Sequence, residues 1–347
     1  MSQQKQRALV VCPGRGTYNK EELGYLHRYH QERLGILTEI DKQRSELNQP
    51  TVSALDAAEK YNLKQHSAGE NASSLIYACA KADFMQINRE RFEIAAITGN
   101  SMGWYITCAL AGSLSPGYGA RLINTMGSMM VDGLIGGQSI YPIVDDDWVA
   151  SPMLENQVSE AIATINRVDG CELYVSIRLG GYVVFGGNDK ALKLLPEYLP
   201  KINDTYPMRF FNHAAFHTPL LDGIAKKAQS LMQPDIFAKP TIPMVDGLGN
   251  IWQPYSCNEK ALHRYTLGTQ VKDVYDYSKA IEVSIKEFAP DKIIILGPGA
   301  TLGGATAQVL IKHNWYDLHS KADFIQRQKA NPVILSMGMP DQRELVI

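Results

Sequence analysis

Residues 94–112, IAAITGNSMGWYITCALAG, join two apolar runs through the segment Gly99-Asn100-Ser101-Met102-Gly103. The runs predict a strand over 92–98 and a buried helix over 102–111. A serine between two glycines at such a junction is typical of a nucleophile elbow, where a strained turn presents the hydroxyl to a cleft. Side chains at the glycine positions would collide with the neighbouring strand and helix. The helix that follows would direct backbone N–H groups at a developing oxyanion.

The same spacing also fits an ordinary glycine-rich turn whose serine only caps a helix, and the motif alone does not decide between them. A serine nucleophile needs a base. His213 and His217 lie in FFNHAAFHTPLL, just past a predicted strand, where a loop can reach a cleft. The other six histidines stand in polar or amphipathic surroundings and are expected on the surface: His27, His30, His66, His263, His313 and His319.

Composition limits the class of protein. The 347 residues are 45% hydrophobic and 20% charged, enough for a sizeable core in one large domain with an insert, or in two domains. The net charge of −2, without a basic stripe, argues against nucleic-acid and membrane partners. Five scattered cysteines without a CxxC pair predict reduced thiols in a cytoplasmic protein, and neither a signal peptide, a membrane span nor a metal site is expected.

Strands alternating with helices predict a mostly parallel sheet, with strands over 8–12, 92–98, 293–296 and 333–337. Residues 19–47 read as one charged amphipathic helix. Residues 132–206 mix helical segments with alternating strands, which suits a small inserted α+β module. The predicted fold is therefore α/β, with a large domain from 1–131 and 207–347 and a small subdomain from 132–206.

Four segments, in order along the chain, resemble the malonyl-CoA:acyl-carrier-protein transacylases and the acyltransferase domains of polyketide synthases. VVCPGRG (10–16) is similar to the family's F-P-G-Q-G, and GNSMGWY (99–105) to G-H-S-x-G-E. AFHTPLL (215–221) is similar to G-A-F-H-S/T-x-L-M, and Gly297-Pro298-Gly299 to a late G-P-G. The resemblance implies an α/β-hydrolase-like large domain and a ferredoxin-like subdomain at 132–206.

The resemblance also implies a ping-pong acyl transfer in fatty-acid or polyketide-type biosynthesis. Ser101 would attack an acyl thioester while His217, oriented by a main-chain carbonyl, takes its proton. The backbone N–H groups of Arg15 and Met102 would hold the oxyanion. Gln270 matches a glutamine of the family site, with a solvated polar residue as the alternative. Asn100 and Phe216, beside the reacting pair, are expected to contact substrate.

The same resemblance implies no bound cofactor, because acyl-CoA or a phosphopantetheinyl thioester is the substrate. An acyl carrier protein is the expected partner, met transiently by a cytoplasmic monomer.

Departures from the family pattern point to a different acyl group. Met126 stands where the family has an arginine that binds the malonate carboxylate, and Arg121 occupies another position of the same helix. A methionine cannot pair with a carboxylate. With Met102, Met129 and Met130, it suggests an adaptable apolar acyl site, although ordinary core packing explains Met129 and Met130 equally well. The expected acyl group is uncharged: acetyl, a longer fatty acyl, or a polyketide or peptidyl intermediate.

Other departures keep alternatives open. Asn100 and Trp104 replace the family's histidine and its acidic or glutamine residue, and Arg15 replaces a glutamine and changes the charge at the cleft mouth. The alternatives are an acyl-thioester hydrolase with an editing role, a true malonyltransferase, and a non-catalytic module that binds carrier proteins.

Overall fold

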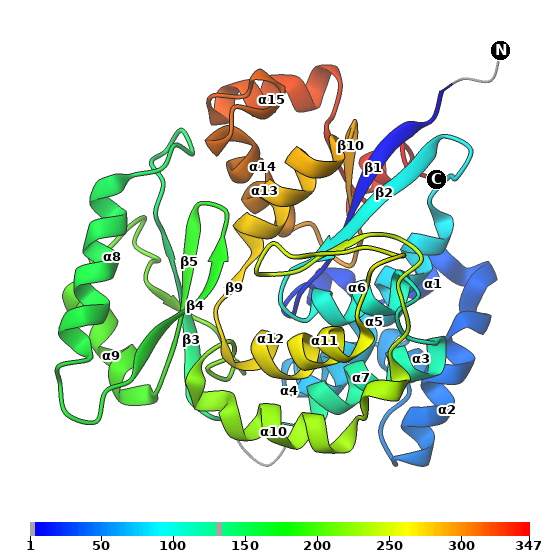
Figure 1. Ribbon diagram of the computed structural model, residues 1–347, viewed down its shortest axis with the longest axis horizontal. Helices are drawn as coiled ribbons and strands as arrows, with labels where there is room; N and C mark the ends of the chain where they lie inside the picture. The colour runs from blue at the N-terminus through cyan, green and yellow to red at the C-terminus, as the bar shows by residue number, and fades with distance from the viewer. Residues whose placement is uncertain (1–3, 130–133) are drawn as a thin grey trace.

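The structure is a computed structural model that describes residues 4–129 and 134–347, and its strands form two separate sheets (Figure 1). The larger sheet has the strand order β11-β10-β1-β2-β7-β8. All neighbours in it run parallel except β7 and β8, which are antiparallel. Its strands are β1 (Gln6–Cys12), β2 (Phe92–Gly99), β7 (Met244–Val245), β8 (Ile251–Trp252), β10 (Lys292–Ile295) and β11 (Ile334–Ser336).

Strand β1 lies in the middle of this sheet because its sequence suits burial on both faces. Residues 8–12, ALVVC, are all buried, and β10 and β2 pair with them on either side. A continuous apolar run of this kind is what a parallel strand covered by helices requires. The strand therefore delivers the loop that follows it, Pro13-Gly14-Arg15-Gly16, to the carboxyl edge of the sheet.

The smaller sheet has the order β6-β3-β5-β4-β9 and is antiparallel except where β9 joins β4. Its strands are β3 (Gly137–Pro142), β4 (Leu173–Leu179), β5 (Tyr182–Gly187), β6 (Met208–Arg209) and β9 (Tyr275–Asp276). Helices α8 (Pro152–Ile165) and α9 (Asp189–Tyr198) cover the face turned away from the rest of the chain (Figure 1). The chain order β3-α8-β4-β5-α9-β6 is that of a ferredoxin-like fold.

The predicted fold class is confirmed: a large α/β domain with a mostly parallel sheet accompanies a small ferredoxin-like subdomain. The division of the chain into 1–131 with 207–347 and 132–206 stays a prediction. Its first boundary lies outside the described residues. The small sheet also takes β6 and β9 from beyond residue 206.

Within residues 4–129 and 134–347, fourteen further helices surround the large sheet or connect its strands. Several begin with a serine or asparagine whose side chain accepts a backbone N–H: Ser115 caps α7, Ser320 caps α15 and Asn258 caps α11. The helices are α1 (Tyr25–His30), α2 (Thr38–Glu46), α3 (Val52–Asp56), α4 (Leu63–His66), α5 (Gly69–Gln86), α6 (Gly103–Leu110), α7 (Pro116–Ser128), α10 (Asp222–Leu231), α11 (Glu259–Arg264), α12 (Gln270–Lys272), α13 (Tyr277–Phe288), α14 (Leu302–Lys312), α15 (Lys321–Ala330) and α16 (Pro340–Arg343).

The single helix predicted over 19–47 is wrong in detail. The segment divides into a 3-10 turn (Lys20–Glu22), α1, a 3-10 stretch (Gln31–Leu37) and α2. Gly24 breaks the first part because its φ of 80° lies in the left-handed region, which glycine enters without a steric penalty. The apolar spacing did not reveal these interruptions.

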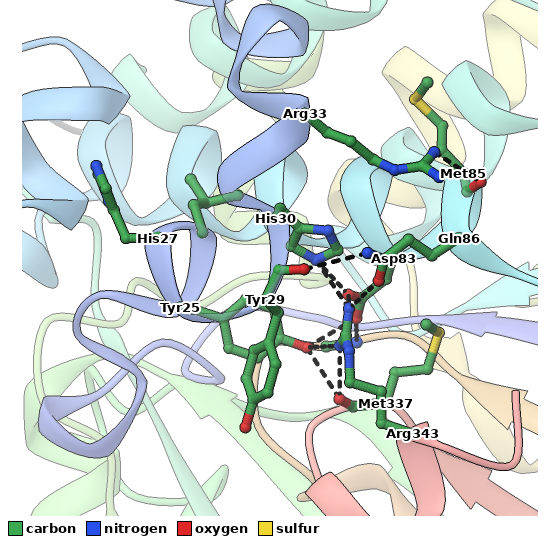
Figure 2. A network of polar contacts seen from close by, with 12 residues as sticks. Tyr25, His27, Tyr29, His30, Arg33, Asp83, Met85, Gln86, Met337 and Arg343 are labelled. Atoms are coloured by element: carbon green, nitrogen blue, oxygen red, sulfur yellow. Dashed lines mark hydrogen bonds and ion pairs between the residues drawn. The ribbon is translucent and has the colours of Figure 1, made fainter. Parts of the chain in front are cut away.

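A buried polar network around Asp83 ties this segment to the rest of the large domain (Figure 2). One carboxylate oxygen of Asp83 accepts from the Tyr25 hydroxyl at 2.8 Å and from the Gly297 backbone N–H at 2.7 Å. The other lies 2.8 Å from both His30 Nε2 and Arg343 Nη2. The network thus joins α1, α5, the loop after β10 and the C-terminal helix α16.

Removing the cation of this network should destabilise the fold strongly. Asp83 is fully buried, so Arg343→Met leaves a buried carboxylate without its guanidinium partner. We expect a loss of about 3–5 kcal/mol in the free energy of unfolding, measured by urea denaturation. The exposed arginine Arg33 serves as the control, and Arg33→Met should cost no more than about 0.5 kcal/mol. Equal losses for the two variants would contradict this account of the network.

Candidate active site

Ser101 occupies a sharp turn between the end of β2 and the start of α6. Its φ of 55° lies in the left-handed region, a strained conformation for a residue with a side chain. A β-carbon on Gly99 would lie 2.4 Å from the carbonyl oxygen of Gly103, and one on Gly103 would lie 2.5 Å from that of Cys12. Both contacts are with backbone, so the turn requires glycine at both positions.

The hydroxyl of Ser101 meets the imidazole of His217. Ser101 Oγ lies 2.7 Å from His217 Nε2. His217 also has a left-handed backbone, with φ 56°, and its N–H donates to the Val271 carbonyl. Burial lowers the pKa of His217 to about 4, against the hydrogen bond to Gln270, which raises it. The ring is therefore neutral near pH 7 and able to accept a proton.

Gln270 holds both members of this pair. Its carbonyl oxygen accepts from His217 Nδ1 at 2.6 Å, and its side-chain Nε2 donates to the Ser101 carbonyl at 3.0 Å. The Tyr105 hydroxyl donates to Gln270 Oε1 at 2.6 Å and so fixes the orientation of the amide. A π-helical turn, Tyr265–Thr269, precedes Gln270; such turns are frequent at functional sites.

Sequence reasoning did not single out Tyr105. Its position could have been noticed, because Tyr105 stands four residues after Ser101, about one turn along the predicted helix, and so lies near the nucleophile.

Two backbone N–H groups are available where an oxyanion would form. In the part of the chain that the structure describes, neither Arg15 N–H nor Met102 N–H donates to another residue, and both residues line the cleft beside Ser101. Met102 immediately precedes α6, whose positive N-terminal end points toward the turn. This arrangement is what the sequence predicts for the oxyanion hole, and the role itself stays a prediction.

The cleft lies between the carboxyl edge of the large sheet and the inner face of the small one. Its volume is about 540 Å³. It is lined by Ser101 and His217, by Ile140, Ile177 and Val184 of the small sheet, and by Thr301 and Leu302, which follow the Gly297-Pro298-Gly299 segment. The lining is mostly apolar, which suits a hydrocarbon chain better than a highly charged ligand.

The predicted substrate-contacting residues line this cleft. Met126 and Phe216 are partly buried at its wall, and Asn100 lies at its floor, where its Oδ1 is buried without a partner among the described residues. Met126 and Met129 both pack against the main hydrophobic core, and of the two only Met126 lines the cleft; Met130 lies outside the described residues.

Other side chains lie where the sequence did not place them. Trp104 is fully buried away from the cleft, where its indole N–H donates to Thr266 Oγ1. The expected surface location is wrong for His30, His66 and His263, which are all buried and hydrogen-bonded. The partners of His30 and His263, Asp83 and the Met232 carbonyl, come from distant segments, whereas His66 contacts the nearby carbonyls of Leu55 and Asn62.

The Arg15 side chain is half-buried and lines the cleft. Its Nη2 donates to the carbonyl oxygens of Ser67 and Asn212, at 3.2 and 2.9 Å, and its guanidinium carbon lies 5.4 Å from the centre of the Phe216 ring. Burial lowers the pKa of Arg15 to about 10, with Glu70 opposing the shift, so the group stays cationic near pH 7.

Neither a protein-family model nor a curated protein matches this sequence. Solved structures do resemble it. An acyl-carrier-protein S-malonyltransferase from Burkholderia pseudomallei is 17% identical, with a TM-score of 0.72 over 98% of each chain. The malonyl-CoA:ACP transacylase of Synechocystis is 15% identical, with a TM-score of 0.70 over 98% of this chain and 100% of that one.

A third structure, a malonyl-transacylase in complex with a type II PKS acyl-carrier protein, is 18% identical, with a TM-score of 0.70 over 88% of this chain and 93% of that one. At these identities the likeness shows the fold. The chain has the fold of malonyl-CoA:ACP transacylases, as the sequence resemblance predicts.

Over residues 4–129 and 134–347, no cluster of three or more histidine, cysteine, aspartate or glutamate side chains is arranged to hold a metal ion. None of the helices described there has the length and apolar character needed to cross a membrane.

The elbow predicts a difference between two glycines. Gly103→Ala should lower the free energy of unfolding by about 1–3 kcal/mol, because the added methyl meets backbone that must move. Gly223, in α10, has open space around its α-carbon, so Gly223→Ala should change stability by no more than about 1 kcal/mol, in the stabilising direction. Urea denaturation of both variants tests this prediction. An unchanged free energy of unfolding for Gly103→Ala would contradict the close backbone packing at the turn.

Proposed function

We propose that this protein is a serine-dependent acyltransferase that moves an acyl group from a thioester to the thiol of a carrier protein. One observation carries the proposal: Ser101 Oγ lies 2.7 Å from the Nε2 of a buried histidine whose Nδ1 is held by a carbonyl oxygen. A serine placed in this way is an activated nucleophile. The cleft beside it is large enough for an acyl chain and the end of a thioester arm.

The chemistry takes place in two halves. Ser101 Oγ attacks the thioester carbonyl and passes its proton to His217 Nε2, while the N–H groups of Arg15 and Met102 stabilise the oxyanion. The C–S bond then breaks, and the departing sulfur takes the proton from His217. An acceptor thiol attacks the acyl-serine by the reverse route and restores both residues.

The acyl group is uncharged in this proposal. Met126 lines the cleft where a carboxylate would need a partner, and the wall around it is apolar. A malonyltransferase is the second candidate, supported by the names of the solved structures that share the fold.

An acyl carrier protein is the proposed partner, and the thioester of coenzyme A or of phosphopantetheine the proposed substrate. A solved transacylase of the same fold was captured with a carrier protein, which supports such a partner for this chain. A transient encounter with a monomeric, cytoplasmic enzyme stays part of the proposal. A hydrolase and a non-catalytic binding module are outcomes that the next experiment distinguishes.

Intact-protein mass spectrometry after mixing with acetyl-, octanoyl- and malonyl-CoA tests the proposal. We expect an acyl adduct from the uncharged thioesters, absent in Ser101→Ala and present in Ser159→Ala, which alters an exposed serine on α8. Adding holo-carrier protein should remove the adduct and acylate the carrier. A malonyl adduct would favour the malonyltransferase, steady release of free acid the hydrolase, and no adduct with no acid the binding module.

The rate of acylation should depend little on pH above 5. His217 must be neutral to accept the proton, and its lowered pKa of about 4 leaves about 90% of it neutral at pH 5. An ordinary histidine pKa of about 6.5 would leave only about 3% neutral there. Rapid-quench measurement of acyl-enzyme formation between about pH 5 and 8 separates the two cases. A tenfold fall per pH unit below about 6.5 would contradict the buried, neutral base.

A further inference from the structure

Two polar side chains of the cleft lining, those of Arg15 and His213, both lie beside the ring of Phe216. The guanidinium carbon of Arg15 is 5.4 Å from the ring centre, and the ring centre of His213 is 6.1 Å from it in an edge-on arrangement. Arg15 Nη2 also donates to the carbonyl of Asn212, the residue before His213. Both side chains line the cleft, and Phe216 precedes His217 in the chain.

Arg15 contributes hydrogen-bond donors to the cleft. Its Nη2 is engaged by two carbonyls, but in the described part of the chain Nε and Nη1 have no acceptor, and no carboxylate lies within ion-pair distance. A β-carbon built on Gly69 would lie 3.5 Å from Arg15 Nη1 and 2.4 Å from the Gly127 carbonyl oxygen. Arg15 Nη1 thus lies close to Gly69, which itself packs against Gly127, the neighbour of Met126.

His213 contributes an acceptor, because a chain of hydrogen bonds fixes its tautomer. The Phe216 carbonyl can only accept, so Ser176 Oγ donates to it, at 2.7 Å. Ser176 Oγ must then accept from Gln138 Nε2, at 2.6 Å, which turns Gln138 Oε1 toward His213 Nδ1, at 2.8 Å. Since that oxygen can only accept, Nδ1 carries the proton and Nε2 carries a lone pair. Burial and Arg15 lower the pKa of His213 to about 3, so the ring stays neutral.

A donor beside an acceptor selects the chemistry of the ligand. A hydroxyl can accept from Arg15 and donate to His213 Nε2 at the same time. A carboxylate has acceptors only and would face the imidazole lone pair. An alkyl chain would leave both polar groups without partners, which costs binding energy. The hydroxyl is therefore the best match to the pair.

We propose that Arg15 and His213 form a specificity subsite that recognises a hydroxyl group on the acyl chain. The substrate class is then an uncharged hydroxyacyl thioester. This assignment rests on the proposed acyl transfer through Ser101, and it adds two specificity-determining side chains to the same cleft. Because both side chains line the same cleft as Ser101 and His217, the hydroxyl lies on the part of the acyl chain that this cleft holds.

The test compares the rates at which Ser101 is acylated by butyryl-CoA, by its 2-, 3- and 4-hydroxy derivatives, and by malonyl-CoA. We expect the best hydroxybutyryl thioester to exceed butyryl about 10- to 100-fold in kcat/KM, the effect of hydrogen bonds that include a charged donor. Arg15→Met and His213→Phe should each bring this ratio close to one. Arg121→Met, which alters an exposed arginine on α7, is the matched control and should leave the ratio unchanged.

A wild-type ratio near one, or malonyl as the best substrate, would overturn the subsite while leaving acyl transfer intact. If a variant is acylated by neither butyryl-CoA nor the hydroxybutyryl thioesters, the substituted side chain is needed for acylation itself and not for recognition of the hydroxyl. That result would also overturn the subsite. An absence of acylation by every thioester in the wild type would overturn the proposed function and the subsite with it.

Discussion

The candidate site depends on one hydrogen bond, from His217 Nδ1 to the carbonyl oxygen of Gln270 at 2.6 Å. A carbonyl can only accept, so it leaves Nε2 as the nitrogen without a proton, directed at Ser101 Oγ. An acid in the same place would also add a negative charge that favours a protonated ring. The neutral carbonyl orients the imidazole without adding that charge. Burial therefore keeps the pKa of His217 low.

The rest of the fold holds this bond in position. The elbow sets Ser101 at the carboxyl end of β2, and the Gln270 side chain returns to the Ser101 carbonyl. Tyr275 packs on the His217 ring while its hydroxyl donates to the Gly99 carbonyl, which connects the small sheet to the elbow. The Asp83 network holds the loop after β10, whose continuation lines the cleft. The two sheets thus meet at the serine.

The sequence predicts the parts that depend on local pattern. Apolar runs separated by glycine turns led to the parallel sheet, and the glycine spacing led to Ser101. Partners far apart in the chain were not predictable in this way. No residue near Arg15 in sequence predicts that its side chain donates to the Ser67 and Asn212 carbonyls. Likewise, no residue near His30 predicts its contact with Asp83. The tautomer of His213 depends on three further residues and follows only once all of them are placed.

The most direct test of the central claim is the protonation state of the His217 ring, measured by ¹⁵N NMR of histidine-labelled protein and assigned with a His217→Gln variant. The account predicts a neutral ring at pH 6 with the proton on Nδ1 and an unprotonated Nε2, because burial lowers its pKa to about 4. A ring protonated on Nε2, or one that titrates near the ordinary histidine pKa of about 6.5, would contradict it.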